Sequence, residues 1–83
     1  MSDQEVQNII SNLNHLLDNC TQNFRESELI EVGERFKLVR KQCDFWGETD
    51  NTARQIYDLK DFGMWFCDKI AEVEKEFWDE ESS

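Results

Sequence analysis

The clearest chemical signal in the sequence is a short basic segment within an acidic chain. Residues 35–41 carry four positive charges and no negative charge, on Arg35, Lys37, Arg40 and Lys41. Arg54 follows a polar break and falls in the first turn of the next expected helix. Arginine binds phosphate through a planar fork of N–H donors, lysine adds a point charge, and free backbone amides at a helix N-terminus favour anions. The pattern therefore predicts a binding site for a compact anion.

An ordinary solvated helix face is the alternative interpretation of the same basic segment. Glu31 precedes Arg35 by four residues and Glu34 precedes Lys37 by three, which are spacings for ion pairs along a helix. The chain as a whole has a formal net charge of −10. A local basic site can still act, because salt screens distant charges beyond about 8–10 Å. Binding of DNA or RNA over the whole surface is not expected at this charge.

No residue pattern in the chain indicates catalysis. His15 lies within the first expected helix, without an evident Asp or Cys partner, and the carboxylates are spread over helix surfaces. The sequence contains no glycine-rich phosphate loop and no nucleophile elbow. The three cysteines, Cys20, Cys43 and Cys67, are widely separated and form no CxxC pair. We therefore expect a protein that is not an enzyme, holds no metal or cofactor, and keeps its cysteines reduced and mostly buried.

Cellular location is indicated by what the sequence lacks. The first residues do not resemble a signal peptide, and no apolar run approaches the roughly 20 residues that span a bilayer. Reduced cysteines are typical of cytoplasmic proteins. The expectation is a cytoplasmic protein without membrane contact.

The spacing of apolar residues predicts one all-α domain over residues 1–83. Pro is absent and only three Gly are present, which favours long helices. A first helix is expected at about 3–19, where the apolar residues recur every three or four positions. A second helix is expected at about 28–44, with Ser27 as its N-cap, and Gly47 marks the break that follows.

The third predicted helix, at about 52–78, is too long for a compact three-helix unit. It would measure roughly 40 Å, against a diameter of roughly 30 Å for a compact domain of this size. One end should therefore overhang, followed by a frayed acidic tail at 79–83. Eight of the ten aromatic residues lie from Phe45 onward. Four of them fall largely outside the core-facing positions of this helix, namely Tyr57, Phe62, Trp65 and Trp78. A second apolar face predicts a homo-oligomer built on this helix, and the alternative is a wide core stripe with some exposed rings.

The segment from Arg35 to Ala71 resembles the C-terminal half of a family of small phage proteins, the anti-CBASS cyclic-oligonucleotide sponges. In that family a Ser-Arg-Glu turn opens a helix, and Met-Trp and Ala-Ile follow along it. Here Ala53 and Gln55 stand in place of that Ser and Glu, on either side of Arg54. The positions that carry the resemblance are Thr52-Ala53-Arg54-Gln55, Leu59, Phe62-Gly63-Met64-Trp65 and Ile70-Ala71.

The resemblance implies a small helical protein that assembles as a hexamer and sequesters the cyclic nucleotide signals of bacterial immunity, without chemistry on the ligand. It implies Arg54 as a ligand contact and the Met64-Trp65 turn as packing. Phosphates would suit the basic residues, and the bases of the ligand would stack on aromatic rings. A two-fold-symmetric ligand fits an isologous interface between protomers. The expected binding residues are Phe24, Arg35, Lys37, Arg40, Lys41, Arg54 and Tyr57.

The acidic composition supports a second hypothesis from a different class. A chain with 19 acidic and 9 basic residues could bind a basic partner protein as an inhibitor, in the manner of a DNA mimic. In that case the acidic residues from Glu72 onward, and not the basic segment, would carry the activity.

Overall fold

The structure, a computed structural model, describes the backbone of residues 2–82 and the side-chain surroundings of residues 4–79. Within these residues the chain is all-helical and contains no strand. Helix α1 spans Ser2–Asn19, α2 spans Glu26–Glu48 and α3 spans Thr52–Ser82. The prediction of three helices, the last one longest, is confirmed.

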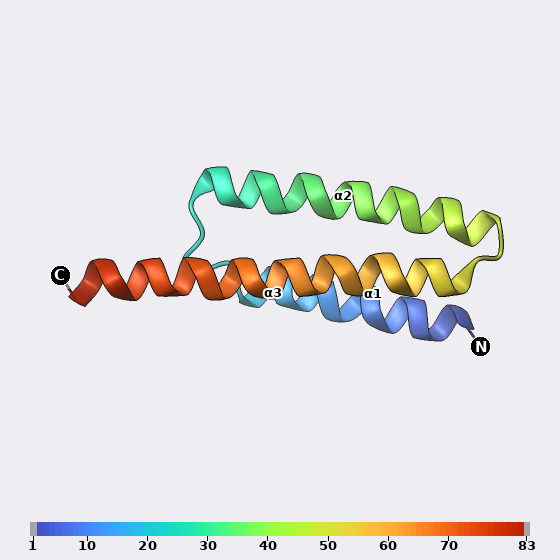
Figure 1. Cartoon of the computed structure of the whole chain (residues 1–83), viewed down its shortest axis with the longest axis horizontal. Helices are drawn as coiled ribbons and strands as arrows, with labels where there is room; N and C mark the ends of the chain where they lie inside the picture. Colours follow the sequence, from blue (N-terminus) through green and yellow to red (C-terminus); the bar gives the residue numbers. More distant parts are fainter. Residues whose placement is uncertain (1, 83) are drawn as a thin grey trace.

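Helix α3 is the element on which the other two pack. Figure 1 shows α2 running alongside α3 in the opposite direction, while α1 lies behind the N-terminal part of α3 and runs the same way. Across the described residues no Cα of α1 lies within 8 Å of a Cα of α2. The C-terminal end of α3 extends beyond both neighbours (Figure 1), and the molecule measures 51 × 20 × 17 Å. The predicted overhang is therefore present.

Helix α2 begins earlier than the sequence indicated, and its N-cap is Arg25 rather than Ser27. The backbone N–H of Arg25 donates to Oε1 of Glu28 at 2.9 Å, and Arg25 accepts the first helical bond from the N–H of Leu29. Ser27 lies inside the first turn. The carboxylate three residues into the helix satisfies the N-terminus, so the hydroxyl cap that we predicted is not needed.

The turn between α2 and α3 also corrects a prediction. Gly47 belongs to α2, and it is Asp50, with φ 56°, that adopts the left-handed conformation. A short acidic residue tolerates this region better than most side chains. Asn51 then caps α3, because its Oδ1 accepts the N–H of Arg54 at 3.2 Å. The expected break at Gly47 falls about three residues too early.

The acidic tail expected at 79–83 is helical as far as the structure describes it. Helix α3 continues to Ser82, and Ser83 lies outside the described residues. No Pro or Gly interrupts this segment, so nothing local stops the helix after Trp78.

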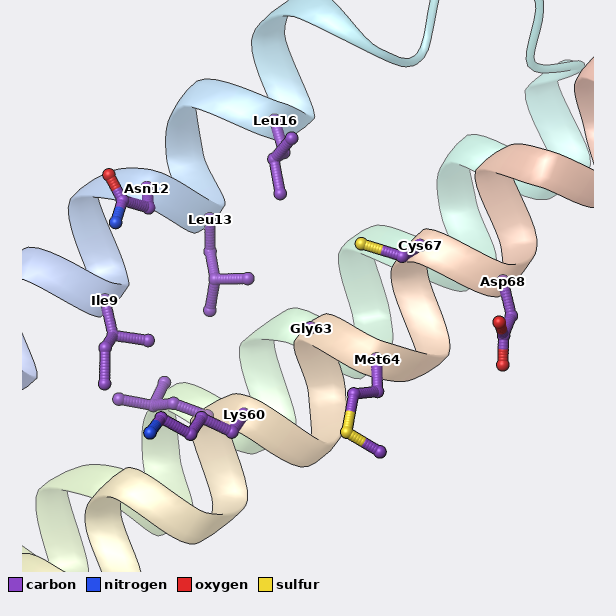
Figure 2. A pocket seen from close by; sticks show the side chains of 10 residues that line it. Ile9, Asn12, Leu13, Leu16, Lys60, Gly63, Met64, Cys67 and Asp68 are labelled. Carbon is purple, nitrogen blue, oxygen red and sulfur yellow. The ribbon is translucent and has the colours of Figure 1, made fainter.

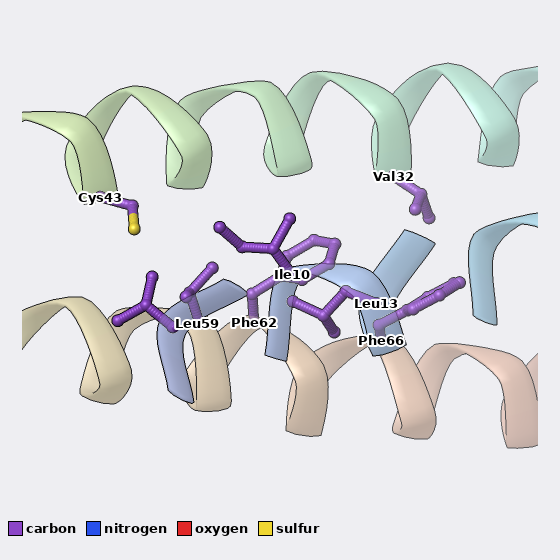
Figure 3. Close-up of a cluster of buried hydrophobic side chains, with 8 residues drawn as sticks. Ile10, Leu13, Val32, Cys43, Leu59, Phe62 and Phe66 are labelled. Carbon is purple, nitrogen blue, oxygen red and sulfur yellow. The ribbon is translucent and has the colours of Figure 1, made fainter. Parts of the chain in front are cut away.

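The core lies along α3, between α1 and α2. Figure 3 shows Ile10 and Leu13 of α1 meeting Leu59, Phe62 and Phe66 of α3, with side chains of α2 above them. Phe62 is only 1% exposed, so its assignment outside the core-facing positions was wrong. Because α3 is covered by two helices, a wider arc of its surface is buried than a single stripe would give. The fully buried or nearly buried set comprises Val6, Ile10, Leu13, Val32, Cys43, Leu59, Phe62, Phe66 and Val73.

The cysteines occupy three different environments. Cys43 is buried, Cys20 is half-buried and Cys67 is exposed, and all three are free thiols. The expectation of mostly buried cysteines therefore fails at Cys67.

Candidate functional site

The seven predicted binding residues do not converge in a single chain. Phe24 lies in the loop between α1 and α2, half-buried, with its ring edge-on to Phe66 at 6.2 Å. Phe66 is twelve residues beyond Arg54 on α3, which is about 18 Å along the helix axis. Phe24 therefore packs at the edge of the core and does not join Arg54 or Tyr57.

The basic segment divides over two sides of α2, because Lys37, Arg40 and Lys41 have the i, i+3, i+4 spacing of one side while Arg35 lies on another. Lys37 and Lys41 are exposed, and among the described residues neither makes an ion pair within 4.0 Å. Arg35 turns towards α3, where its guanidinium carbon lies 4.4 Å from the centre of the Trp65 ring. The Glu31–Arg35 pair of the alternative interpretation is absent, because Glu31 pairs with Lys69 of α3 at 3.4 Å.

Arg40 differs from the other basic residues in being half-buried. Its guanidinium carbon lies 5.9 Å from the centre of the Phe36 ring. Its Nε is buried and, within the described part of the chain, has no hydrogen-bond partner. Arg40 is therefore partly enclosed against a ring of its own helix, whereas Lys37 and Lys41 are exposed.

The structure gathers one group of polar and aromatic side chains at the start of α3, which we call the Arg54 cluster: Trp46, Arg54, Tyr57 and Asp58. The guanidinium carbon of Arg54 lies 5.6 Å from the centre of the Trp46 ring and 5.3 Å from that of Tyr57. Its Nε is 3.6 Å from Oδ1 of Asp58. Tyr57 is 61% exposed, so one ring of the cluster is open to a ligand.

Two contacts between α2 and α3 hold this cluster in place. The indole Nε1 of Trp46 donates to Oδ2 of Asp58 at 2.9 Å, and Nε2 of Gln55 donates to the backbone carbonyl of Cys43 at 3.0 Å. Both residue pairs lie twelve positions apart across the turn, so local sequence patterns gave no sign of them. The Arg54–Asp58 spacing of four residues was the only visible signal.

A shallow groove of about 280 Å³ lies between α2 and α3 beside the Arg54 cluster. Arg54 contributes one positive charge to its wall, while Asp58 and Asp61 contribute two negative charges. An anionic ligand at this groove must therefore compete with carboxylates for Arg54. The arrangement supplies a cation and a flat exposed ring, and it contains no nucleophile with an adjacent base.

A second and larger groove, of about 530 Å³, runs between α1 and α3. Figure 2 shows Ile9, Leu13 and Leu16 of α1 facing α3, where the sulfur of Cys67 points towards α1. Gly63 lies at its floor, where an added Cβ would meet a methyl carbon of Leu13 at 3.4 Å. The walls of this groove are mainly apolar, unlike those of the groove beside Arg54.

Elsewhere in the described chain, Arg25 and Glu28 at the start of α2 line a small hollow of about 30 Å³ together with Glu76 of α3. His15 is exposed on α1. Burial raises the pKa of the Cys43 thiol, although the hydrogen bond from Gln55 opposes the effect. No group of three His, Cys, Asp or Glu residues is arranged to hold a metal ion among the residues described. Within the same part of the chain, none of the helices has the length and apolarity to cross a membrane.

Comparison with known proteins gave no match. No family model fits the chain, and no curated protein and no solved structure matches it significantly.

Proposed function

We propose that this chain is a non-enzymatic phage anti-defence protein that binds and sequesters cyclic di- or oligonucleotide signals at sites between protomers in the host cytoplasm. The proposal joins the resemblance of residues 35–71 with the geometry of the Arg54 cluster. Sequestration acts by stoichiometry, so the protein needs a tight site and slow release, without a catalytic group.

The observation that carries the proposal is the contact of Arg54 with the exposed ring of Tyr57. A cyclic nucleotide offers flat bases and phosphates within one compact ligand. A base can stack on Tyr57, which contributes about 1–3 kcal/mol in single-strand binding proteins, while phosphate accepts hydrogen bonds from Arg54. The cap at Asn51 places both residues in the first two turns of α3, where the helix dipole also favours anions.

The structure narrows the set of residues on which the proposal depends. Phe24 is packed against Phe66 and lies away from the Arg54 cluster. Lys41 is exposed on α2 and does not line the groove beside Arg54. Arg54 and Tyr57 are therefore the primary contacts, and the other basic residues join the site only if a second protomer brings them there.

Titration calorimetry with cyclic dinucleotides and cyclic trinucleotides tests this proposal. Arg54→Ala should abolish measurable heat, and Asp58→Asn should strengthen binding, because it removes the competing charge but keeps an oxygen for the Trp46 indole. Lys41→Ala is the control for the loss of one positive charge and should change affinity little. No heat at tens of micromolar ligand, or equal losses for Arg54→Ala and Lys41→Ala, would count against the site.

The overhang of α3 favours the alternative function, an acidic inhibitor of a basic partner protein. The last turns of α3 extend beyond the other helices (Figure 1). The exposed acidic residues of this segment are Glu72, Glu74, Glu76 and Asp79. This function predicts that Glu74→Gln with Glu76→Gln weakens capture of a basic partner and that binding falls steeply with salt. Arg54→Ala would leave such binding unchanged.

A further inference from the structure

Helix α3 carries a second apolar face that its own chain does not cover. Four residues repeat at intervals of seven and are all exposed; we call them the outer stripe: Tyr57, Met64, Ala71 and Trp78. Tyr57, Met64 and Trp78 are 61%, 67% and 62% exposed. A spacing of seven residues keeps side chains on nearly one line along a helix and is the repeat of coiled-coil contacts. Phe62 and Phe66, by contrast, point into the core (Figure 3).

The apolar surface continues from the outer stripe into the groove between α1 and α3. Met64 belongs to both, and Cys67 and Gly63 connect them (Figure 2). A folded chain of 10.0 kDa is expected to expose about 5,200 Å², whereas this chain exposes 6040 Å². The excess is close to the roughly 800 Å² that one partner buries in an interface of standard size.

We infer that a second copy of this chain covers the outer stripe, with the two α3 helices antiparallel and the two-fold axis near Cys67. An antiparallel pair centred between Cys67 and Asp68 places Tyr57 opposite Trp78 of the partner subunit. It likewise places Met64 opposite Ala71 of the partner subunit, so each large side chain meets a smaller or complementary one. The contact is isologous, so the same surface of each subunit is used and this pair of surfaces is closed.

The charges beside the outer stripe are compatible with the antiparallel direction. On one flank Lys60 comes opposite Glu74 of the partner subunit, and on the other flank Asp61 comes opposite Lys75 of the partner subunit. A parallel pair in register would also bring Lys60 opposite Asp61 of the partner subunit, so these charges do not distinguish the two directions. The antiparallel direction follows from the stripe itself, because it sets Trp78 opposite Tyr57 of the partner subunit instead of against a second Trp78.

The interface rests on the proposed function only in where it would place the ligand, and it can be tested in the absence of nucleotide. Because the outer stripe ends at Tyr57, the Arg54 cluster lies at each end of the dimer, next to Trp78 of the partner subunit. A ligand there would be enclosed by two protomers, as the proposed function requires. The assembly itself needs no ligand, so its mass is measured in the absence of nucleotide and its failure is distinguishable from a failure to bind nucleotide.

Sedimentation equilibrium of the full chain tests the interface with two matched variants. Met64→Glu puts a charge in the outer stripe, whereas Leu38→Glu makes the same change on α2 at nearly equal exposure, 66% against 67%. Met64→Glu should weaken dimerisation roughly tenfold or more, and Leu38→Glu should leave the mass of the wild type. Both positions are exposed, so neither variant should unfold the chain, and circular dichroism checks this.

Oxidation with copper phenanthroline tests the register. The proposed axis brings Cys67 of the two subunits close together, and rotation of the exposed side chains lets the thiols meet. Each pair then loses two protons and two electrons to Cu(II) and forms one disulfide. The cross-linked dimer should appear in the wild type and be lost in Cys67→Ser, which retains Cys20 and Cys43. A single-chain mass at tens of micromolar, or dissociation by Leu38→Glu instead of Met64→Glu, would overturn the interface. A dimer that does not cross-link through Cys67 would overturn the register.

Discussion

Phe62 provides the sharpest test of how α3 is packed. Its ring is 1% exposed and lies among three other aromatic rings, with centroid distances of 5.3 Å to Phe36, 5.9 Å to Trp65 and 5.8 Å to Phe66. Truncation of a buried Phe to Ala costs about 3–5 kcal/mol. A chain of 83 residues has a free energy of unfolding of about 4–12 kcal/mol. Phe62→Ala should therefore leave the protein only marginally folded.

The milder variant Phe62→Leu keeps the effect measurable. It should lower the free energy of unfolding by about 1–2 kcal/mol, because the aromatic contacts are lost and the space is only partly refilled. Phe45→Ala is the control: Phe45 is 50% exposed and its ring contacts that of Trp46 at 5.0 Å, so its loss should cost at most about 1 kcal/mol.

Urea unfolding followed by circular dichroism measures these differences. Phe62→Ala should shift the midpoint far more than Phe45→Ala, with an unchanged slope if the unfolded state is the same. Equal midpoints for the two alanine variants would refute the burial of Phe62 between α1 and α2. Such a result would restore the simpler arrangement in which Phe62 lies on the outer side of α3.

Two further predictions concern glycines and a buried thiol. Gly33→Ala should raise the free energy of unfolding by about 0.5–1 kcal/mol, since an added Cβ meets nothing within 4 Å in the interior of α2. Gly47→Ala should gain almost nothing, because its Cβ would lie 2.8 Å from Nε2 of Gln55 and disturb the bond to the Cys43 carbonyl; thermal melting compares the two. Because burial raises the pKa of Cys43 in the folded state, the thiol ionises first in the unfolded state as the pH rises above the ordinary pKa of 9.0. The free energy of unfolding should therefore fall above that pH, and Cys43 should have no such effect below it. Replacement of Cys43 by Ala should flatten the pH dependence of the urea midpoint in that range, and a thiol reagent should modify Cys67 well before Cys43.

The number and order of the helices were predictable, whereas their ends were not. The spacing of Val6, Ile10 and Leu13 indicated a helix, because a local pattern sufficed to place each residue on one face. The end of α2 was missed, since Gly47 also fits a helix interior and the left-handed position fell to Asp50. A glycine marks where a turn is possible, and only the capping contacts around it decide where the turn occurs.

The buried faces of α3 and the composition of the candidate site were harder to predict, because both depend on contacts between helices. A single-sequence pattern assigns one buried stripe to a helix, but α3 is covered on two sides, and this brings Phe62 into the core. The basic segment was contiguous in sequence, yet a helix turns 100° per residue and carries Arg35 and Lys41 to different sides. Contacts such as Trp46–Asp58 join residues across a turn, and no local spacing predicts them.

The lack of direct backbone proximity between α1 and α2 has a consequence for how the molecule opens. Their side chains share one core, but each backbone packs closely only on α3, so detaching α1 leaves the α2–α3 hairpin with its own ion pair and indole bond intact. Hydrogen exchange should accordingly divide the chain into two cooperative units, with the amides of α1 exchanging at a lower opening free energy than those in the middle of α3. Opening at α1 would expose the buried side chains of Leu13 and Phe66 to solvent while α2 and α3 stay paired, so the core would become accessible before the two long helices separate.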